Sequence, residues 1–257
     1  MSGIESIGLA GVAAVAGAVN AVAGGGTLLT FPALLYFGTP GIVANATSTV
    51  ALVIGTAGSI FGFRGQLGAV KGWLARFVPV SLLGGAVGSV LLTRTSERAF
   101  GALVPWLILF ATLLFVAHGA FRKLAGFEEN GEAHPHSRAV WMAVVFQFAV
   151  SVYGGFFGAG IGILMLASLG FLGLRDIHEM NALKNALGSL INLIAAAVFV
   201  ASGLVDWPKA GVMTVGAVVG YFLGAHFSQR VPQRRVRRII TGIGLTISLA
   251  MFWQRLR

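Results

Sequence analysis

Two glycine-rich breaks interrupt apolar runs of the sequence and suggest a binding chemistry. Residues 24–26 are three consecutive glycines, and residues 158–160 read Gly-Ala-Gly. A short apolar segment follows each break, at 27–38 and 161–173, and neither reaches the 20 or so residues that a membrane span needs. The N-terminus of such a segment would lie within the membrane and present backbone N–H groups and a partial positive charge. The breaks therefore predict two anion-binding turns, although glycines here could also serve only to pack helices closely.

If the first turn binds an anion, Gly25 and Gly26 should not tolerate a side chain. A methyl group at Gly25 or Gly26 should block the approach of an oxyanion or strain the turn. We therefore expect Gly25→Ala and Gly26→Ala to weaken anion binding and to leave stability nearly unchanged. Other glycines lie four residues apart inside uninterrupted apolar runs and are typical of helix packing: Gly84, Gly88, Gly220 and Gly224.

Lys184 is a cation inside a segment that we expect to cross the membrane. A lysine at membrane depth is costly and usually functional, and this one could be the counter-charge of an anion. It lies only about one turn into its predicted helix. Its long side chain could therefore instead reach the membrane surface and serve no substrate.

Neutral hydroxyl and carboxamide groups lie on two further segments, around 45–49 and 181–192, and on Asn20. They could donate hydrogen bonds to an anion, although each alone is more often a contact between helices. We predict no catalytic residue and no metal ligand. The predicted substrate-binding residues are Asn20, Gly24, Gly25, Gly26, Thr27, Asn45, Thr47, Ser48, Thr49, Gly158, Ala159, Gly160, Asn181, Lys184, Asn185 and Asn192.

The composition places these residues in a membrane protein. Of 257 residues, 56% are hydrophobic and 10% are charged, whereas soluble domains carry about a quarter charged residues. The first run lacks a basic leader and is far longer than the core of a signal peptide, so we expect it to remain as the first span. The sequence predicts an all-α, polytopic transmembrane bundle. Its charge-free runs are 7–63, 77–93, 99–121, 139–174, 185–205, 210–229 and 239–254.

Glycine and proline divide the chain into about ten predicted helical segments. We predict a first membrane repeat at 1–121, a cytoplasmic linker at 122–138 and a second membrane repeat at 139–257. The expected helices are 4–22, 27–38, 43–62, 73–92 and 99–119 in the first repeat, and 139–157, 161–173, 180–202, 209–228 and 237–253 in the second.

The two halves match each other at an offset of 134 to 138 residues, which aligns both glycine breaks and pairs Asn45 with Asn181. Loop 229–238 holds five arginines and no acid, whereas its counterpart 93–98 holds two arginines and Glu97. Basic loops favour the cytoplasm, so corresponding loops face opposite sides. This is the pattern of an inverted repeat, and it places both termini outside. Whether the short segments cross fully or re-enter stays open.

The charged residues also exclude several functions. The net charge of +10 does not predict nucleic-acid binding, because the basic residues lie in short connections between apolar runs. The chain has no cysteine, and its eight acidic residues lie in loops or at helix ends. No G-x-S-x-G or H-E-x-x-H motif occurs. We therefore expect no cofactor and no enzyme activity. The expected partners are a small anionic substrate and membrane lipid, and a homo-oligomer stays open.

Several motifs together resemble the TauE/SafE sulfite exporter family over nearly the whole chain. They are the run from Asn20 to Pro32 (NAVAGGGTLLTFP), the run 44–49 (ANATST), the run 154–160 (GGFFGAG), and Asn181-Ala-Leu-Lys-Asn185 with Asn192. Ala159 departs from a full triple glycine in the second half. The resemblance implies a membrane protein that moves sulfite, thiosulfate, sulfonates or related organic anions.

The mechanism that we expect is export of the anion across the inner membrane by alternating access around a midplane site. The membrane potential already drives an anion outward by about 2.3 kcal/mol per charge per 100 mV, so no buried carboxylate relay is needed. The alternatives are an anion channel, a partner that delivers substrate to a cytosolic enzyme and, as a more distant choice, an intramembrane enzyme. The sequence leaves open the anion, the direction and any coupling ion.

Overall fold

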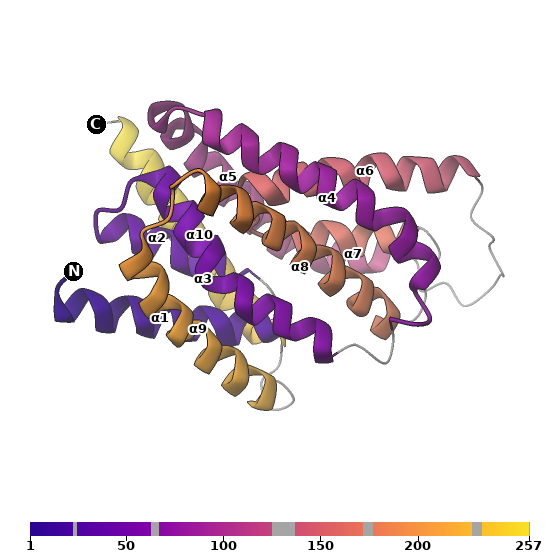
Figure 1. Cartoon of the computed structure of the whole chain (residues 1–257), viewed down its shortest axis with the longest axis horizontal. Helices are drawn as coiled ribbons and strands as arrows, with labels where there is room; N and C mark the ends of the chain where they lie inside the picture. Colours follow the sequence, from indigo (N-terminus) through magenta and orange to yellow (C-terminus); the bar gives the residue numbers. More distant parts are fainter. Residues whose placement is uncertain (23–24, 63–66, 125–136, 172–176, 228–232, 257) are drawn as a thin grey trace.

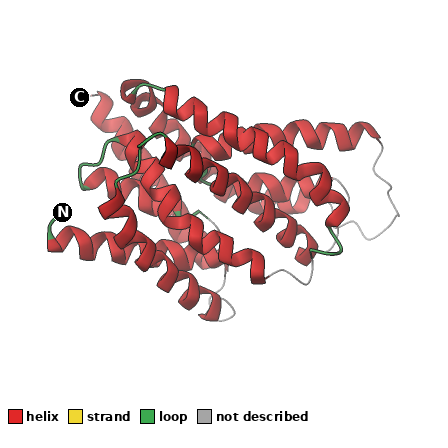
Figure 2. Ribbon diagram, in the orientation of Figure 1, coloured by secondary structure: helices red, strands yellow, loops and turns green. Residues whose placement is uncertain are grey.

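The computed structural model describes residues 1–22, 25–62, 67–124, 137–171, 177–227 and 233–256, and every regular element in these ranges is a helix (Figure 2). The helix boundaries agree with the predicted segments to within a few residues, except that α5 continues five residues past its predicted end at 119. The helices are α1 (Gly3–Val22), α2 (Thr27–Tyr36), α3 (Gly41–Gly62), α4 (Lys71–Arg94), α5 (Glu97–Leu124), α6 (Ser137–Phe156), α7 (Ile161–Phe171), α8 (Ile177–Ala201), α9 (Trp207–Phe227) and α10 (Gln233–Leu256).

The closest helix pairs join one half of the chain to the other. Helix α1 packs along α9, and α4 packs along α6 (Figure 1). Matching α1–α5 with α6–α10 in order turns the pair α1·α9 into the pair α6·α4. It likewise turns α3·α9 into α8·α4 and α1·α2 into α6·α7. The pairs α3·α8 and α5·α10 map onto themselves. This correspondence is consistent with a duplicated bundle. The inverted orientation of the two halves stays a prediction.

Small residues let the α1·α9 pair approach closely. Gly220 lies against the backbone of Ala14, and a Cβ added at Gly220 would overlap the Ala14 carbonyl. Gly224 meets Ala18 in the same way, one turn further on. In the α4·α6 pair, a Cβ at Gly84 would lie 2.6 Å from the Cβ of Ser151. The prediction that these glycines pack helices is confirmed.

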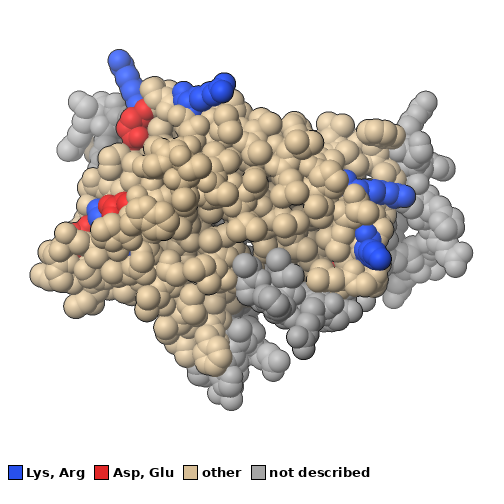
Figure 3. Space-filling view, in the orientation of Figure 1, with Lys and Arg blue, Asp and Glu red and all other residues tan. Residues whose placement is uncertain are grey.

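The surface matches a lipid environment. Large apolar side chains are exposed on several helices, among them Trp106, Leu113, Trp141 and Phe222. Charged side chains gather at the two ends of the molecule, and the surface between them is uncharged in this view (Figure 3). Within the described residues, and by length and composition alone, four helical stretches could cross a membrane: Gly3–Ala21, Lys71–Arg94, Glu97–Leu114 and Glu179–Ala201.

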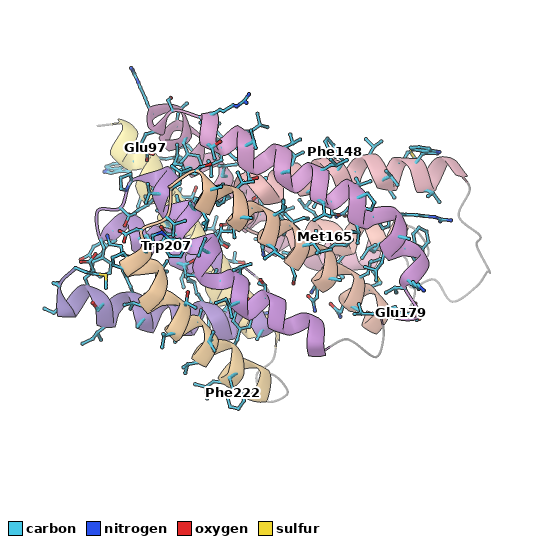
Figure 4. The ribbon with its side chains drawn as sticks, in the orientation of Figure 1. Glu97, Phe148, Met165, Glu179, Trp207 and Phe222 are labelled. Atoms are coloured by element: carbon cyan, nitrogen blue, oxygen red, sulfur yellow. The ribbon has the colours of Figure 1, made fainter. Side chains whose placement is uncertain are left out.

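One end of the bundle is tied together by ionic contacts. Lys209 Nζ lies 3.0 Å from Glu5 Oε1 and donates to Thr39 Oγ1 at 2.9 Å. At the same end, the Glu97 carboxylate accepts the N–H of Gly41 at the start of α3. Glu97 and Trp207 mark this end of the molecule, and Glu179 marks the other (Figure 4). The contacts bring together the N-terminus, the α2–α3 connection and the start of α9 at one end of the bundle.

Candidate functional site

The second glycine turn connects α6 to α7 through a backbone that needs glycine at two places. Gly158 has φ +82° and Gly160 has φ +80°, values in the left-handed region that glycine adopts at least cost. Ala159 lies between them outside that region, which explains why alanine is tolerated there. The N–H groups of Phe157 and Gly158 both donate to the Tyr153 carbonyl, at 2.9 and 3.2 Å. The chain therefore reverses in a defined geometry before α7 begins.

The first turn of α7 leaves backbone donors unused. The Ile163 N–H donates to the Gly160 carbonyl at 3.0 Å. Within the described residues, the N–H groups of Gly160, Ile161 and Gly162 have no acceptor. These are the orphan donors that begin any helix, and here no side chain caps them. They form the part of the structure best suited to bind an anion.

Lys184 lies against this helix start. Its Cδ is 3.4 Å from the position that a Cβ on Gly162 would occupy, and its Cγ and Cε lie within 4.0 Å of the same point. Its Nζ donates to Asn181 Oδ1 at 3.1 Å, one turn back toward the start of α8. The Lys184 side chain thus lies beside α7, and its ammonium bonds toward the start of α8. Both interpretations stay open: Lys184 as the counter-charge of an anion, and Lys184 as a side chain that reaches the membrane surface.

A polar stripe on α8 continues from Lys184 along one face. Apart from the adjacent pair Lys184 and Asn185, successive residues of the stripe lie three or four apart, which places them on one side of a helix, and all are half-buried. Asn192 Oδ1 lies 4.0 Å from the position that a Cβ on Gly158 would occupy, so the stripe passes the second glycine turn. Its members are Asn181, Lys184, Asn185, Gly188 and Asn192.

The first glycine turn differs from the second in its hydrogen bonds. Gly25 has φ +89°, and Gly24 lies outside the described residues. The Gly26 N–H donates to Asn20 Oδ1 at 2.9 Å, and Asn20 Nδ2 donates to the Tyr221 hydroxyl at 2.6 Å. Both polar atoms of Asn20 are therefore engaged inside the protein, together with the N–H that we expected to meet a substrate.

Polar residues predicted on α3 bond to protein partners in this conformation. Asn45 Nδ2 donates to the Phe156 carbonyl at 3.0 Å, and Ser48 Oγ shares a 2.6 Å hydrogen bond with Thr30 Oγ1. Thr47 Oγ1 accepts the N–H of Asp206 at 3.0 Å. These contacts match the alternative that we left open, hydrogen bonds between segments.

Two further predicted residues of the first half lie on α3 and at the start of α2. Thr49 Oγ1 donates to the Asn45 carbonyl at 2.9 Å, and Thr27 is half-buried at the start of α2. Asn45 Oδ1 is buried and has no hydrogen-bond partner among the described residues. An unpaired acceptor of this kind would repel an anion. The structure places the α8 stripe beside the second turn, and it ties Asn45 to the end of α6, just before that turn.

Comparison with known proteins supplies the class of function for this geometry. The family model for the sulfite exporter TauE/SafE matches residues 9–251. The chain belongs to the TauE/SafE family. A "Probable membrane transporter protein" of Haemophilus influenzae is 28% identical over 243 residues, covering 94% of this chain and 92% of the relative. No solved structure matches the chain.

Two further relatives have the same kind of name. One is "Probable membrane transporter protein ORF9" of a Sinorhizobium species, 27% identical over 245 residues and covering 92% of this chain and 87% of the relative. The other is YunE of Bacillus subtilis, also a "Probable membrane transporter protein", 21% identical and covering 93% of this chain and 94% of the relative. Together with the apolar helices, these matches identify this TauE/SafE chain as a multi-pass membrane transporter.

Two tyrosines that support the glycine turns were not predicted from the sequence. The chain has three tyrosines. Tyr36 is exposed, whereas the hydroxyls of Tyr153 and Tyr221 each bond a residue at or next to a glycine turn. A rare polar aromatic residue inside an otherwise apolar segment is a signal that could have pointed to both.

Proposed function

We propose that this TauE/SafE protein moves a small sulfur oxyanion, such as sulfite, or an organosulfonate across the inner membrane, and that the anion binds at the start of α7. The observation that carries the proposal is the coincidence of three orphan N–H groups at Gly160–Gly162 with the Lys184 side chain packed on Gly162. Hydrogen bonds from the backbone and one nearby cation are the groups that recognise an oxyanion.

The family name supports the substrate class, and the membrane potential favours the direction. Because the cell interior is negative, an exported anion gains about 2.3 kcal/mol per charge per 100 mV. We propose alternating access, in which the repeats at 1–121 and 139–257 rearrange around the bound anion. Membrane lipid surrounds the bundle, and no nucleic acid, cofactor or catalysis enters the proposal. A homo-oligomer is compatible with it.

Purified protein in liposomes tests this function. We expect saturable efflux of sulfite, with thiosulfate and taurine compared in the same vesicles, and faster efflux when the inside is negative. An anion channel would instead give a flux that does not saturate and shows no counter-transport. Absence of flux for every sulfur anion in the presence of folded protein would reject the proposal.

The proposed orientation has its own test, since the native chain has no cysteine. Single cysteines at positions 67 and 234 should be protected from an impermeant thiol reagent added outside cells, whereas one at 206 should be labelled. Labelling of 234 and 206 from the same side would contradict inverted halves with both termini outside.

A further inference from the structure

The peptide unit between Ala159 and Gly160 is held at one end by a half-buried tyrosine side chain. The Tyr153 hydroxyl donates to the Ala159 carbonyl at 2.7 Å. A peptide unit is planar and trans, so its C=O and N–H point in opposite directions. A bond that fixes the Ala159 carbonyl toward Tyr153 therefore fixes the Gly160 N–H on the side away from Tyr153.

Tyr153 is itself well placed to hold the turn. It lies on α6, and its ring packs edge-on against Phe110 with the ring centres 5.4 Å apart. Its backbone carbonyl accepts the N–H groups of Phe157 and Gly158. One residue thus fixes the turn through both its backbone and its hydroxyl.

The corresponding peptide of the first half is held at its other end. The repeat alignment pairs Gly25–Gly26 with Ala159–Gly160. In the first half the N–H of this peptide is bound by Asn20, whereas in the second half its C=O is bound by Tyr153. In the first half the N–H of this peptide is already hydrogen-bonded, whereas in the second half it remains available to a ligand.

We propose that Tyr153 is a positioning residue that directs the Gly160 N–H toward the transported anion. This inference rests on the proposed function, because it concerns the same binding site at the start of α7. Tyr153 does not touch the anion and acts only through the orientation of the peptide. Its loss should therefore weaken anion binding more than it slows the conformational cycle.

The test compares sulfite uptake into proteoliposomes by Tyr153→Phe, Tyr221→Phe and the native protein. Both substitutions remove one buried hydroxyl and keep the ring, but only Tyr153 holds the peptide whose N–H is unused. We expect Tyr153→Phe to raise KM about tenfold with a maximal rate within about twofold of native, since the Gly160 N–H would no longer be held in place for its hydrogen bond to the charged ligand. Tyr221→Phe should lose comparable stability and keep the native KM.

A conservative replacement separates positioning from stability. Placing 4-aminophenylalanine at position 153 restores a donor at the same place and should return KM toward the native value. The inference is overturned if Tyr153→Phe keeps the native KM while Lys184→Gln is impaired, and the proposed function would survive that result. It is also overturned if both tyrosine variants raise KM equally, or if the amino variant fails to restore KM although it is folded. A native protein that moves neither sulfite nor thiosulfate rejects the function and this inference together.

Discussion

The two glycine turns of this protein begin short helices in corresponding places, yet they use their backbone groups in opposite ways. At the first turn the Gly26 N–H is bound by Asn20, which is held by Tyr221 from α9. At the second turn the Ala159 carbonyl is bound by Tyr153, and the following N–H groups have no acceptor within the described residues. Matching glycine motifs therefore do not make matching sites, because neighbouring side chains decide whether a helix start is available to a ligand.

The two turns also differ in the charged side chain that lies beside them. Lys184 lies on α8 beside the start of α7, and its counterpart in the first half is Ser48, which is fully buried and bonded to Thr30. Among the described residues, only the second half combines an open helix start with a cation. We therefore expect substitutions at the two turns to have different kinds of effect, on binding at the second and on stability at the first.

The largest effect should come from Lys184. Removing the cation beside this helix start in Lys184→Gln should raise the KM for sulfite by tenfold or more, since hydrogen bonds to charged groups contribute about 1.5–3 kcal/mol. Lys184→Arg should retain most of the activity. The measurement is sulfite uptake into vesicles at matched amounts of folded protein. Native transport by Lys184→Gln would leave only the interpretation in which the side chain reaches the membrane surface.

A single methyl group at equivalent glycines should distinguish the turns. Gly160 has φ +80° and only ordinary contacts around its Cβ position, so Gly160→Ala should strain the turn by about 1–2 kcal/mol and weaken sulfite binding severalfold. Gly26 has an ordinary φ of −54°, but its Cβ would lie 2.7 Å from the Ala16 carbonyl. Gly26→Ala should therefore lower the thermal unfolding temperature and leave KM unchanged. Equal losses of affinity in both variants would argue for two equivalent anion sites.

The Gly26 geometry corrects one sequence-based expectation. We expected Gly25→Ala and Gly26→Ala to reduce affinity with little loss of stability. Gly25 has a left-handed φ, and Gly26 packs against the α1 backbone, so both substitutions should cost stability. The sequence marks where the glycines are, and only the packing of α1 beside them shows what each can accommodate.

Asn20 gives a smaller effect, confined to stability. Asn20→Ala leaves the Gly26 N–H and the Tyr221 hydroxyl without their partner, which should cost about 1–3 kcal/mol of unfolding free energy. Sulfite KM should stay within about twofold of native, because the bound anion lies at the other turn. Urea unfolding in detergent measures the first quantity and vesicle uptake the second. A large rise in KM without loss of stability would return Asn20 to the binding site.

Asn192 should have the smallest effect. It lies on the α8 stripe, with Oδ1 4.0 Å from the Cβ position of Gly158, and it carries no charge. We expect Asn192→Ala to raise sulfite KM about two- to fivefold, in line with one neutral hydrogen bond of about 0.5–1.5 kcal/mol. Asn45→Ala, which removes a bond to the Phe156 carbonyl, is the matched control and should lower stability with KM nearly unchanged. The reverse pattern would move the binding site to α3.

Much of the fold follows from the sequence, because runs of apolar residues and glycine breaks fix where helices begin and end in a membrane. The short helices α2 and α7 and the break at 158–160 are where the sequence predicts them. The site is less predictable, since it depends on partners far away in the chain. Nothing near Asn20 in sequence indicates that Tyr221 would hold it, and nothing near Asn45 indicates its bond to Phe156.

Binding of sulfite to purified protein, followed by thermal unfolding, tests the central claim without requiring transport. A ligand that binds only the folded state stabilises it by about 2.7 kcal/mol at a hundred times its Kd. We predict that sulfite at a hundred times the native Kd raises the unfolding temperature of native protein and of Asn20→Ala by the same amount, and that of Lys184→Gln by about half as much or less. Loss of the sulfite effect in Asn20→Ala with a full effect in Lys184→Gln would place the anion at the first turn and contradict the account.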